Sequence, residues 1–328
     1  MPETQNDEFS VLTRAAAERV NAQMVELLPD VPESLYEPLR YLHKSGGKRL
    51  RAILTYLASR STPDANWLPA ACAIECLHTF TLIHDDIMDN ASTRRGQKTL
   101  HKKYDINTAI LAGDVLIAIA NESLARVNYE SLRAMLAEFA HAFRLVCEGQ
   151  ALDKEFENAE AVTIDAYYRM IDMKSAKMIE AAAVLGSYAA GGKYVEELRT
   201  FAHHIGLAFQ VRDDLLDLTG DERSFGKTKG GDILEGKRSY LVVKAMDMFA
   251  ELSDAEQILV RKVQGGAARL GDVAKVEKMM RDRGILTAAE GDIIRLTTEG
   301  KNALASLPDG EFKNGLMLFS DHLLGRET

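Results

Sequence analysis

The chain has 328 residues, of which 46% are hydrophobic and 27% are charged, and its formal net charge at pH 7 is −9. This composition is typical of a globular protein, and the negative charge argues against a nucleic acid as partner. No uninterrupted apolar run reaches the roughly 18 residues that a membrane-spanning helix needs, so no membrane span is expected. Residues 1–8 are polar and acidic, without the regions of a signal peptide, and we expect a flexible end and a cytoplasmic protein.

Apolar residues recur at helical spacing along most of the chain, and alternating strand patterns are nearly absent. This pattern predicts an all-α fold. No linker and no repeat divides the chain, so we expect a single domain over residues 1–328. In chain order, the predicted helices cover residues 11–27, 34–43, a stretch from after Arg51 to about residue 60, then 70–83, 108–127, 130–156, 164–171 and 175–190, and the chain is helical again from 239 to 301. Cys72, Cys76 and Cys147 lie in apolar helical contexts and are expected to be buried thiols of a reducing compartment.

A glycine-rich basic segment, Gly46 to Arg51, precedes the third predicted helix. Its two glycines leave backbone N–H groups close to a helix start, where the helix dipole favours an anion. Lys48 and Arg51 are three residues apart and are therefore neighbours on one helical face. The segment predicts a diphosphate-binding site; the alternative is an ordinary solvated helix start.

The fourth predicted helix is apolar and leads directly into three carboxylates, Asp85, Asp86 and Asp89. Because unpaired buried charge is costly, such a helix end needs a metal ion or another partner. Asp85 and Asp89 are four residues apart and lie one helical turn from each other on the same face. Two carboxylates in this arrangement suit Mg²⁺, which also binds substrate phosphate oxygens. The alternative is a solvated acidic helix end.

A short polar loop with paired arginines, Arg94 and Arg95, follows this helix. Arginine stays charged at any working pH, and its planar guanidinium suits bidentate phosphate contacts. Because adjacent side chains in a loop can point in different directions, one arginine could bind each of two anionic substrates.

Two later helical runs are interrupted, at Gly113-Asp114 and at Gly149-Gln150. Each interruption marks either close helix packing or a polar contact that faces a cavity. Lys174 lies at the entry to a mostly apolar helix. A lysine in that position more often extends to the surface, and only a second anionic-site motif would change this interpretation.

That second motif consists of Asp213, Asp214 and Asp217, which repeat the first spacing at the end of another apolar helix, with Gln210 before them. Facing the first motif across a cavity, it would hold several Mg²⁺ ions with a diphosphate between them. The following loop, residues 220–237, contains glycines and lysines that give it mobility and positive charge. We expect this loop to close over bound phosphate as a lid.

Together these motifs resemble those of the trans-isoprenyl diphosphate synthases, the polyprenyl synthase family. The resemblance covers nearly the whole chain and includes Arg94-Arg95-Gly96 after the first acidic motif, and Gly226-Lys227 and Asp232 after the second. It implies one large helical bundle around a deep central cavity, and a homodimer.

The resemblance also implies roles for individual residues. Asp85, Asp89 and Asp213 match the aspartates that bind Mg²⁺ directly, with three ions per active site and Mn²⁺ able to substitute. The supporting metal positions match Asp86, Asp214, Asp217 and Asp232. The family residues that bind the allylic diphosphate match Arg94, Lys174, Ser175, Gln210, Lys227 and Lys237. At Ser175 the family often has threonine, and serine keeps its hydroxyl. The pocket for isopentenyl diphosphate matches Lys48, Arg51, His78 and Arg95. The implied catalytic residues are Asp85, Asp89, Arg94, Lys174, Gln210, Asp213 and Lys227.

The same resemblance places the floor of the prenyl pocket just before the first acidic motif, at Phe80 with Thr81 and Leu77. This pattern is similar to that of archaeal enzymes that make the C20 product. Helix geometry supports the assignment in part, because Phe80 lies about 7.5 Å along the axis from Asp85 but roughly 140° around it. Thr81 and Leu77 lie closer to the Asp85 face. The alternative for Phe80 is a plain core residue.

The implied reaction is the head-to-tail (1′-4) condensation of isopentenyl diphosphate with dimethylallyl, geranyl or farnesyl diphosphate, and the expected product is geranylgeranyl diphosphate. A farnesyl diphosphate synthase, or an enzyme that makes both products, is the alternative within the class. A class I terpene cyclase is a more remote alternative, because it would not need a second diphosphate pocket. A non-catalytic subunit would be expected to have lost an acidic motif, and both are intact here.

Overall fold

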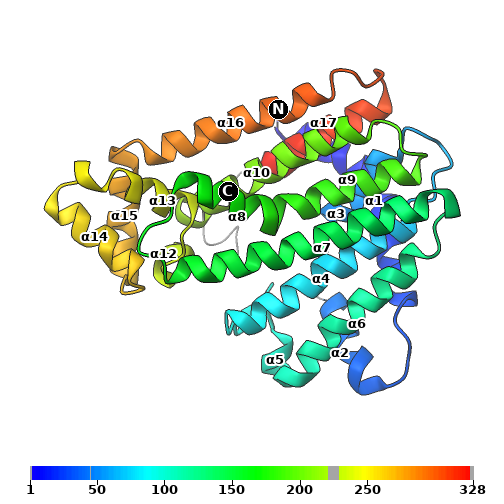
Figure 1. Ribbon diagram of the computed structural model, residues 1–328, viewed down its shortest axis with the longest axis horizontal. Helices are drawn as coiled ribbons and strands as arrows, with labels where there is room; N and C mark the ends of the chain where they lie inside the picture. The colour runs from blue at the N-terminus through cyan, green and yellow to red at the C-terminus, as the bar shows by residue number, and fades with distance from the viewer. Residues whose placement is uncertain (1, 45, 221–228, 326–328) are drawn as a thin grey trace. The chain divides into compact units, whose positions relative to one another are not determined.

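The computed structural model describes residues 2–44, 46–220 and 229–325, and these residues are predominantly helical (Figure 1). The prediction of an all-α fold is confirmed. The chain divides into two compact units. Unit 1 consists of residues 1–143, 178–199 and 306–322, and unit 2 of residues 144–177, 200–305 and 323–328. The single domain expected from the sequence stays a prediction.

Unit 1 is built from the N-terminal helices and parts of four later ones. Its complete helices are α1 (Pro2–Glu26), α2 (Glu33–Lys44), α3 (Leu50–Ser59), α4 (Leu68–Met88), α5 (Leu100–Lys103) and α6 (Ile106–Leu124). It shares α7 (Tyr129–Glu157), α9 (Lys177–Ala189), α10 (Val195–Thr219) and α17 (Glu311–Leu324) with unit 2. Two short strands, β1 (Thr93–Arg94) and β2 (Gln97–Lys98), pair in antiparallel register with Thr93 opposite Lys98.

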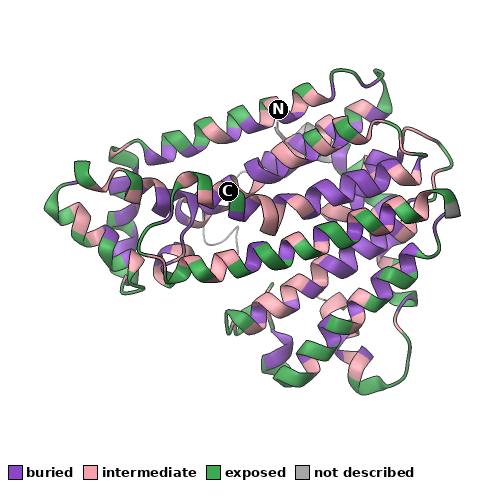
Figure 2. Ribbon diagram, in the orientation of Figure 1, coloured by how far each residue is buried: buried purple, intermediate pink, exposed green. Residues whose placement is uncertain are grey.

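The core of unit 1 is formed around α4, which packs against α1, α3 and, most extensively, α6. The side chains of residues 70–77 of α4 and of residues 178–187 of α9 are all buried (Figure 2). Gly113 allows the close approach of α6, because a Cβ atom at this position would lie 2.3 Å from Nε2 of His84. The interruption at Gly113 therefore marks close helix packing.

Unit 2 contains the remainder of the chain. Its helices are α8 (Ile164–Ile171), the π-helix η1 (Asp172–Ala176), α12 (Gly231–Glu235), α13 (Tyr240–Asp247), the 3₁₀-helix η2 (Phe249–Glu251), α14 (Asp254–Gln264), α15 (Leu270–Asp282) and α16 (Ile285–Ala303), together with parts of α7 and α10.

The π-helix lies between two glycines of neighbouring helices in unit 2. A Cβ atom at Gly149 of α7 would lie 2.4 Å from the backbone nitrogen of Lys174, and one at Gly206 of α10 would lie 2.8 Å from Cα of Ala176. A π-turn is wider than an α-turn and is often found at functional sites. The two glycines leave the room that this wider turn occupies.

Several helix boundaries differ from the prediction. Helix α1 begins at Pro2, well before residue 11, and α4 continues to Met88, so that the first acidic motif forms its last turn. Helix α8 covers residues 164–171, as predicted. In the described part of the chain, no helix has both the length and the apolar character required to cross a membrane.

The expectation that all three cysteines are buried is wrong for one of them. Cys72 and Cys76 are buried, but Cys147 is exposed on α7. Val146, the preceding residue, is buried. One residue along a helix corresponds to a rotation of about 100°, which carries the Cys147 side chain away from the buried face.

Candidate active site

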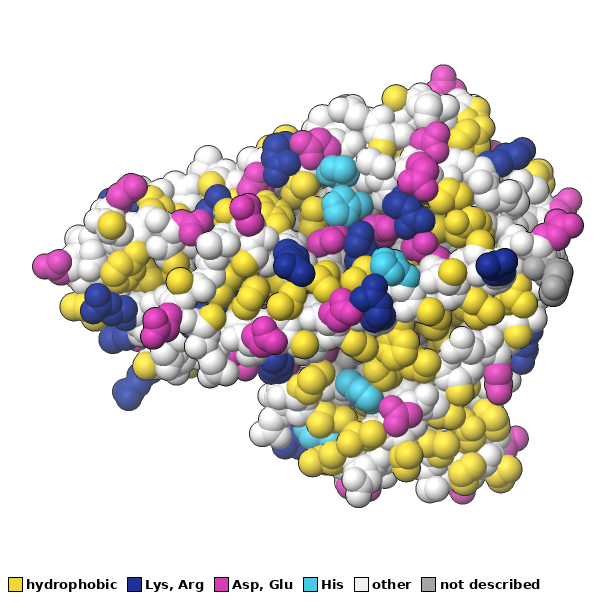
Figure 3. Space-filling model, viewed as in Figure 1, with side chains coloured by type: hydrophobic (Ala, Val, Ile, Leu, Met, Phe, Trp, Pro, Cys, Tyr) yellow, Lys and Arg dark blue, Asp and Glu magenta, His cyan; other side chains and the backbone are white. Residues whose placement is uncertain are grey.

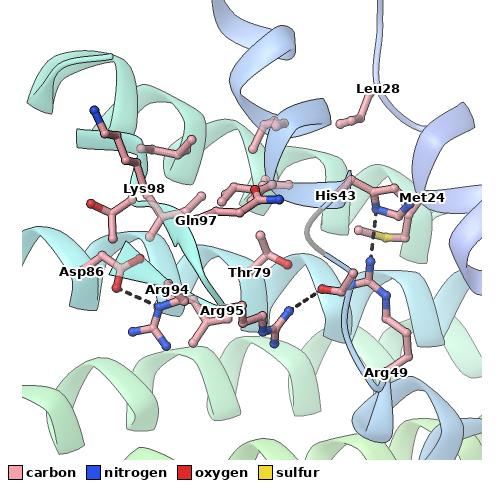
Figure 4. Close-up of a pocket in the computed structure, with 18 residues that line it drawn as sticks. Met24, Leu28, His43, Arg49, Thr79, Asp86, Arg94, Arg95, Gln97 and Lys98 are labelled. Atoms are coloured by element: carbon pink, nitrogen blue, oxygen red, sulfur yellow. Dashed lines mark hydrogen bonds and ion pairs between the residues drawn. The ribbon is translucent and has the colours of Figure 1, made fainter. Parts of the chain in front are cut away.

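The first acidic motif separates into an inward and an outward part in unit 1. Asp86 is 4% exposed, and its Oδ1 accepts a hydrogen bond from Nε of Arg94 at 2.7 Å (Figure 4). Asp85 is half-buried and Asp89 is exposed. The motif thus presents the Asp85 and Asp89 carboxylates outward, while Asp86 holds the strand that carries Arg94.

Burial and charge act in opposite directions on Asp86. Removal from water raises the pKa of the Asp86 carboxyl, and the Arg94 guanidinium lowers it; burial prevails, so the pKa lies above its ordinary value. The bond to Asp86 uses Nε of Arg94, which leaves the two terminal nitrogens of the guanidinium outside that bond. Arg94 therefore has donors in the geometry that a phosphate group requires.

The four residues predicted to bind isopentenyl diphosphate lie in unit 1, on or beside the basic segment. Arg95 donates from Nη1 to the carbonyl oxygen of Gly46 at 2.5 Å, and Nη1 of Arg51 lies 3.2 Å from Nε2 of His78. Lys48 is exposed on the same loop. Arg95 thus holds the glycine turn at Gly46, which has a positive φ of 69°, and Arg51 of α3 contacts His78 of α4.

The surroundings of His78 disfavour the charged form of its imidazole. Burial, followed by the charges of Arg51, Arg95 and Arg94, holds the pKa of the imidazole well below its usual range. A neutral Nε2 can accept the hydrogen bond from Arg51. His78 therefore orients this guanidinium without adding a charge of its own.

Four of the predicted allylic-site residues, Lys174, Ser175, Gln210 and Lys237, line one cavity of about 100 Å³ in unit 2, whereas Arg94 lines a pocket of unit 1. Ser175 donates to Oε1 of Gln210 at 2.8 Å, and Nε2 of Gln210 donates to Oδ1 of Asp214 at 2.9 Å. Nζ of Lys174 donates to Oδ2 of Asp153 at 2.5 Å. The π-helix supplies both Lys174 and Ser175, so the wide turn at this point carries two of the polar groups of the cavity.

The second acidic motif repeats the inward and outward arrangement of the first. Asp214 is 6% exposed, and its Oδ2 accepts hydrogen bonds from the Tyr167 hydroxyl at 2.6 Å and from the backbone nitrogen of Tyr240 at 2.7 Å. Burial, together with the nearby charge of Asp232, raises the pKa of Asp214 to about 7 despite these hydrogen bonds. Asp213 and Asp217 are half-buried.

The two remaining predicted residues after the second motif lie close to each other. Oδ2 of Asp217 accepts a hydrogen bond from the backbone nitrogen of Asp232 at 3.0 Å. Nζ of Lys237 lies 3.8 Å from Oδ1 of Asp232. Asp217 therefore caps the start of α12 and links the second motif to this part of the loop. Lys227 lies outside the described residues, as do residues 221–228 of the predicted lid.

The predicted chain-length residues lie on α4 in unit 1. Leu77 is fully buried and Phe80 is 9% exposed, whereas Thr81 is half-buried. The Phe80 ring contacts Phe143 of α7 edge-on, with 5.2 Å between the ring centroids. Phe143 was not among the predicted residues, because the contact joins two helices that the sequence does not pair.

Asp153 is a further residue that the sequence reasoning missed. It binds Lys174 and lines the same cavity of unit 2. The signal available in the sequence was its position one helical turn after Gly149, the glycine against which the backbone of Lys174 packs.

Comparison with known proteins identifies the chain. The sequence profile described as polyprenyl synthetase matches residues 32–280. The chain belongs to the polyprenyl synthetase family. It is 36% identical to a geranylgeranyl diphosphate synthase of Methanosarcina mazei over 94% of this chain and 95% of the relative. It is also 36% identical to a geranylfarnesyl diphosphate synthase of Natronomonas pharaonis, over 95% of this chain and 97% of the relative. A crystal structure of a geranylgeranyl pyrophosphate synthetase from Pyrococcus horikoshii is similar with a TM-score of 0.88 and 32% identity, over 98% of this chain and 99% of that one.

As a polyprenyl synthetase, the protein is a trans-prenyltransferase. Enzymes of this family depend on Mg²⁺ and act on isoprenyl diphosphates. The carboxylates of this chain fit a hard divalent cation, because the outer aspartates of each motif are oxygen donors one turn apart that reach solvent. The middle aspartates are buried and accept hydrogen bonds from protein donors.

Proposed function

We propose that the protein makes geranylgeranyl diphosphate by adding isopentenyl diphosphate to allylic diphosphates, with farnesyl diphosphate as an intermediate. The observation that carries the proposal is the presence of two chemically distinct anion sites. One is the basic group of Arg51, His78 and Arg95 in unit 1, where Arg95 binds the Gly46 carbonyl and Asp86 lines the same pocket only as the partner of Arg94. The other contains Lys174 and lies beside the second acidic motif. A cyclase would need only one of them.

Each group has a defined task in this reaction. Asp85 and Asp89 of unit 1 and Asp213 of unit 2 would hold Mg²⁺, three ions in all, which would supply the charge that stabilises a departing diphosphate. Arg94 and Lys174 bind the allylic diphosphate and keep it oriented as its C1–O bond breaks. The basic segment holds isopentenyl diphosphate so that its C4 bonds to C1 of the allylic group. The proton then leaves C2 for the departing diphosphate. Because the departing diphosphate takes this proton, no side chain has to act as a base. Arginine and lysine keep their charge throughout.

Similar enzymes support the C20 product, and one of them favours a second candidate. The Methanosarcina relative is named for geranylgeranyl diphosphate, whereas the Natronomonas relative is named for a product one prenyl unit longer. Phe80 supports the shorter product, because a phenyl ring at this place on α4 would stop a growing chain.

The test is incubation with labelled isopentenyl diphosphate, Mg²⁺ and each allylic primer, followed by chromatography of the products. We expect geranylgeranyl diphosphate to dominate with every primer. A product that stops at farnesyl, or one that continues to geranylfarnesyl, would overturn the chain length but leave the reaction class intact. Absence of any elongation would overturn the prenyltransferase proposal. Replacement of Mg²⁺ by Mn²⁺ is expected to keep activity, and EDTA to abolish it.

We also propose a homodimer that associates through α6. Ile106, Ile110 and Leu111 of this helix are exposed, at 54%, 39% and 58% respectively. Figure 3 shows hydrophobic side chains gathered on the surface over this part of unit 1. An apolar helix face of this kind favours association with a second copy.

A cytoplasmic location is the last part of the proposal. Cys72 and Cys76 are buried thiols outside any disulfide, which suits a reducing compartment. Fractionation of cells that express the tagged chain tests this location, and recovery of the protein outside the cytoplasmic fraction would overturn it.

A further inference from the structure

In the sequence Arg49 lies between Lys48 and Arg51, the cations of the proposed isopentenyl diphosphate site, but its side chain is directed into the protein. It is 8% exposed, whereas its neighbour Lys48 is exposed. Figure 4 shows the Arg49 guanidinium beside His43, within the wall of a pocket in unit 1. We infer that Arg49 and its buried partner Glu75 are positioning residues, which fix the basic loop so that Lys48 and Arg51 meet the diphosphate.

Three helices of unit 1 converge on the Arg49 side chain. Nε donates to Oδ1 of Asn21 at 2.9 Å, and Nη2 lies 3.2 Å from Nδ1 of His43. Nη1 donates to Oε2 of Glu75 at 3.4 Å, and the Glu75 side chain is almost completely buried. The guanidinium therefore joins α1, α2 and α4 at one point, and a planar group with donors on three nitrogens is suited to this task.

Glu75 connects this point to the start of α3. Its Oε1 accepts a hydrogen bond from the backbone nitrogen of Ala52, one of the first-turn N–H groups that have no partner within the helix. One carboxylate thus binds both the side chain of the residue before α3 and the backbone of its first turn. Arg51 lies between these two attachments, so its direction follows from them.

The backbone of the loop depends on the same contacts. Arg49 has φ 48° and ψ 33°, a left-handed conformation that costs about 1 kcal/mol or more for a residue other than glycine. Such a conformation persists only where surrounding contacts hold it. On the other side of the loop, Arg95 binds the Gly46 carbonyl, and a Cβ atom at Gly47 would lie 2.8 Å from its Nη1. The loop is therefore held from both ends.

The inference rests on the proposed function, because Lys48 and Arg51 are assigned to isopentenyl diphosphate there. It predicts a selective defect. A displaced loop weakens the binding of isopentenyl diphosphate. The acidic motifs and Lys174, which serve the allylic diphosphate, keep their contacts.

The test uses two variants. Arg49→Lys keeps the positive charge but loses the planar guanidinium that contacts three helices. Glu75→Gln keeps an acceptor for the Ala52 backbone nitrogen but loses the negative charge. We expect the KM for isopentenyl diphosphate to rise about tenfold or more, with the KM for the allylic primer and kcat changed by less than about twofold. The double variant Arg49→Gln/Glu75→Gln buries no unpaired charge and is expected to regain thermal stability while the KM for isopentenyl diphosphate stays high.

A second ion pair of unit 1, in which the carboxylate is buried and the arginine half-buried, provides the control. Arg199 donates to Oε1 of Glu180 at 2.7 Å, and Glu180 is 4% exposed. Glu180→Gln should lower the melting temperature without a selective change in the KM for isopentenyl diphosphate. An unchanged KM in folded Arg49→Lys and Glu75→Gln would overturn the inference, as would an equal rise for both substrates. If the wild-type chain elongates no primer, the proposed function fails instead.

Discussion

The aspartates within each acidic motif have different surroundings. Asp86 and Asp214 are buried and bound by protein donors, whereas Asp85 and Asp213 are only half-buried. Consecutive residues of a helix point about 100° apart, so one turn can offer carboxylates to solvent and to the core at once. The outer aspartates are therefore suited to metal binding, and the middle ones hold the helix end in place.

Replacing Asp85 or Asp213 with Asn is expected to lower kcat by about 100-fold or more, because an amide lacks the negative charge that attracts Mg²⁺. Melting temperatures should stay close to that of the wild type, since both side chains are partly exposed. Steady-state kinetics at saturating substrate, with melting curves, provide the measurement. The exposed Asp64→Asn serves as control, and near-normal turnover of the Asp85 and Asp213 variants would refute direct metal binding.

The raised pKa of Asp214 predicts a pH dependence of stability. Because the pKa in the folded protein is about 7, the folded state retains a proton that the unfolded chain releases near its ordinary value. The stabilising contribution of this group is complete below about pH 4 and is lost as the pH rises through 7. The Asp214→Asn variant has no titratable group at this position, so it lacks this pH dependence.

Urea unfolding of the wild type and of Asp214→Asn, in EDTA at pH 5 and pH 8, measures this effect. The free energy of unfolding of the wild type, relative to the variant, should be smaller at pH 8 than at pH 5. A difference that does not change with pH would mean that Asp214 is ionised in the folded state over the whole range.

At the level of elements, the contact between α4 and α7 bears on product length. The Phe80 and Phe143 rings meet edge-on in unit 1. Phe80→Ala is expected to yield longer prenyl products, because removal of the ring extends the space beyond Asp85, and Phe80→Ala/Phe143→Ala should extend them further. Phe319→Ala removes another buried ring of unit 1 and serves as the control for a loss of packing alone. Product chromatography decides, and unchanged length in both variants would place the floor elsewhere.

The π-helix provides a second prediction for an element. A methyl group at Gly149 would collide with the backbone nitrogen of Lys174 at 2.4 Å. Gly149→Ala is therefore expected to raise the KM for the allylic primer and to lower the melting temperature. Gly291→Ala on α16 is the matched control, since nothing lies within 4 Å of a Cβ there, and it should stabilise the protein by about 0.5–1 kcal/mol. Equal behaviour of the two variants would show that the wide turn tolerates a Cβ.

The sequence predicts the helices better than the contacts between them. Helical periodicity placed α8 correctly, and the acidic motifs were located at helix ends. The π-turn was not predicted, because it depends on Gly149 and Gly206, which come from other helices. The inward direction of Arg49 was missed for the same reason, since its partners are supplied by three other helices.

At the level of the whole molecule, the apolar face of α6 predicts the oligomeric state. Sedimentation velocity should find a dimer for the wild type, and Ile110→Glu/Leu111→Glu should sediment as a monomer because two charges would be buried on association. Ile294→Glu changes an isoleucine of α16 that is even more exposed, and this variant should remain a dimer. A wild-type monomer would refute the dimer, and an unaffected double variant would refute its location.

The exposure of Cys147 distinguishes one thiol of this molecule from the other two. Burial raises the pKa of Cys72 to about 12, and it raises that of the completely buried Cys76 as well. Since the thiolate is the form that reacts with alkylating dyes, the native protein directs such a dye to Cys147 without any engineered change. The dye would lie on α7 two residues before Gly149, the residue packed against Lys174. A dye attached to Cys147 would therefore serve as a fluorescence reporter for substrate binding near the π-helix.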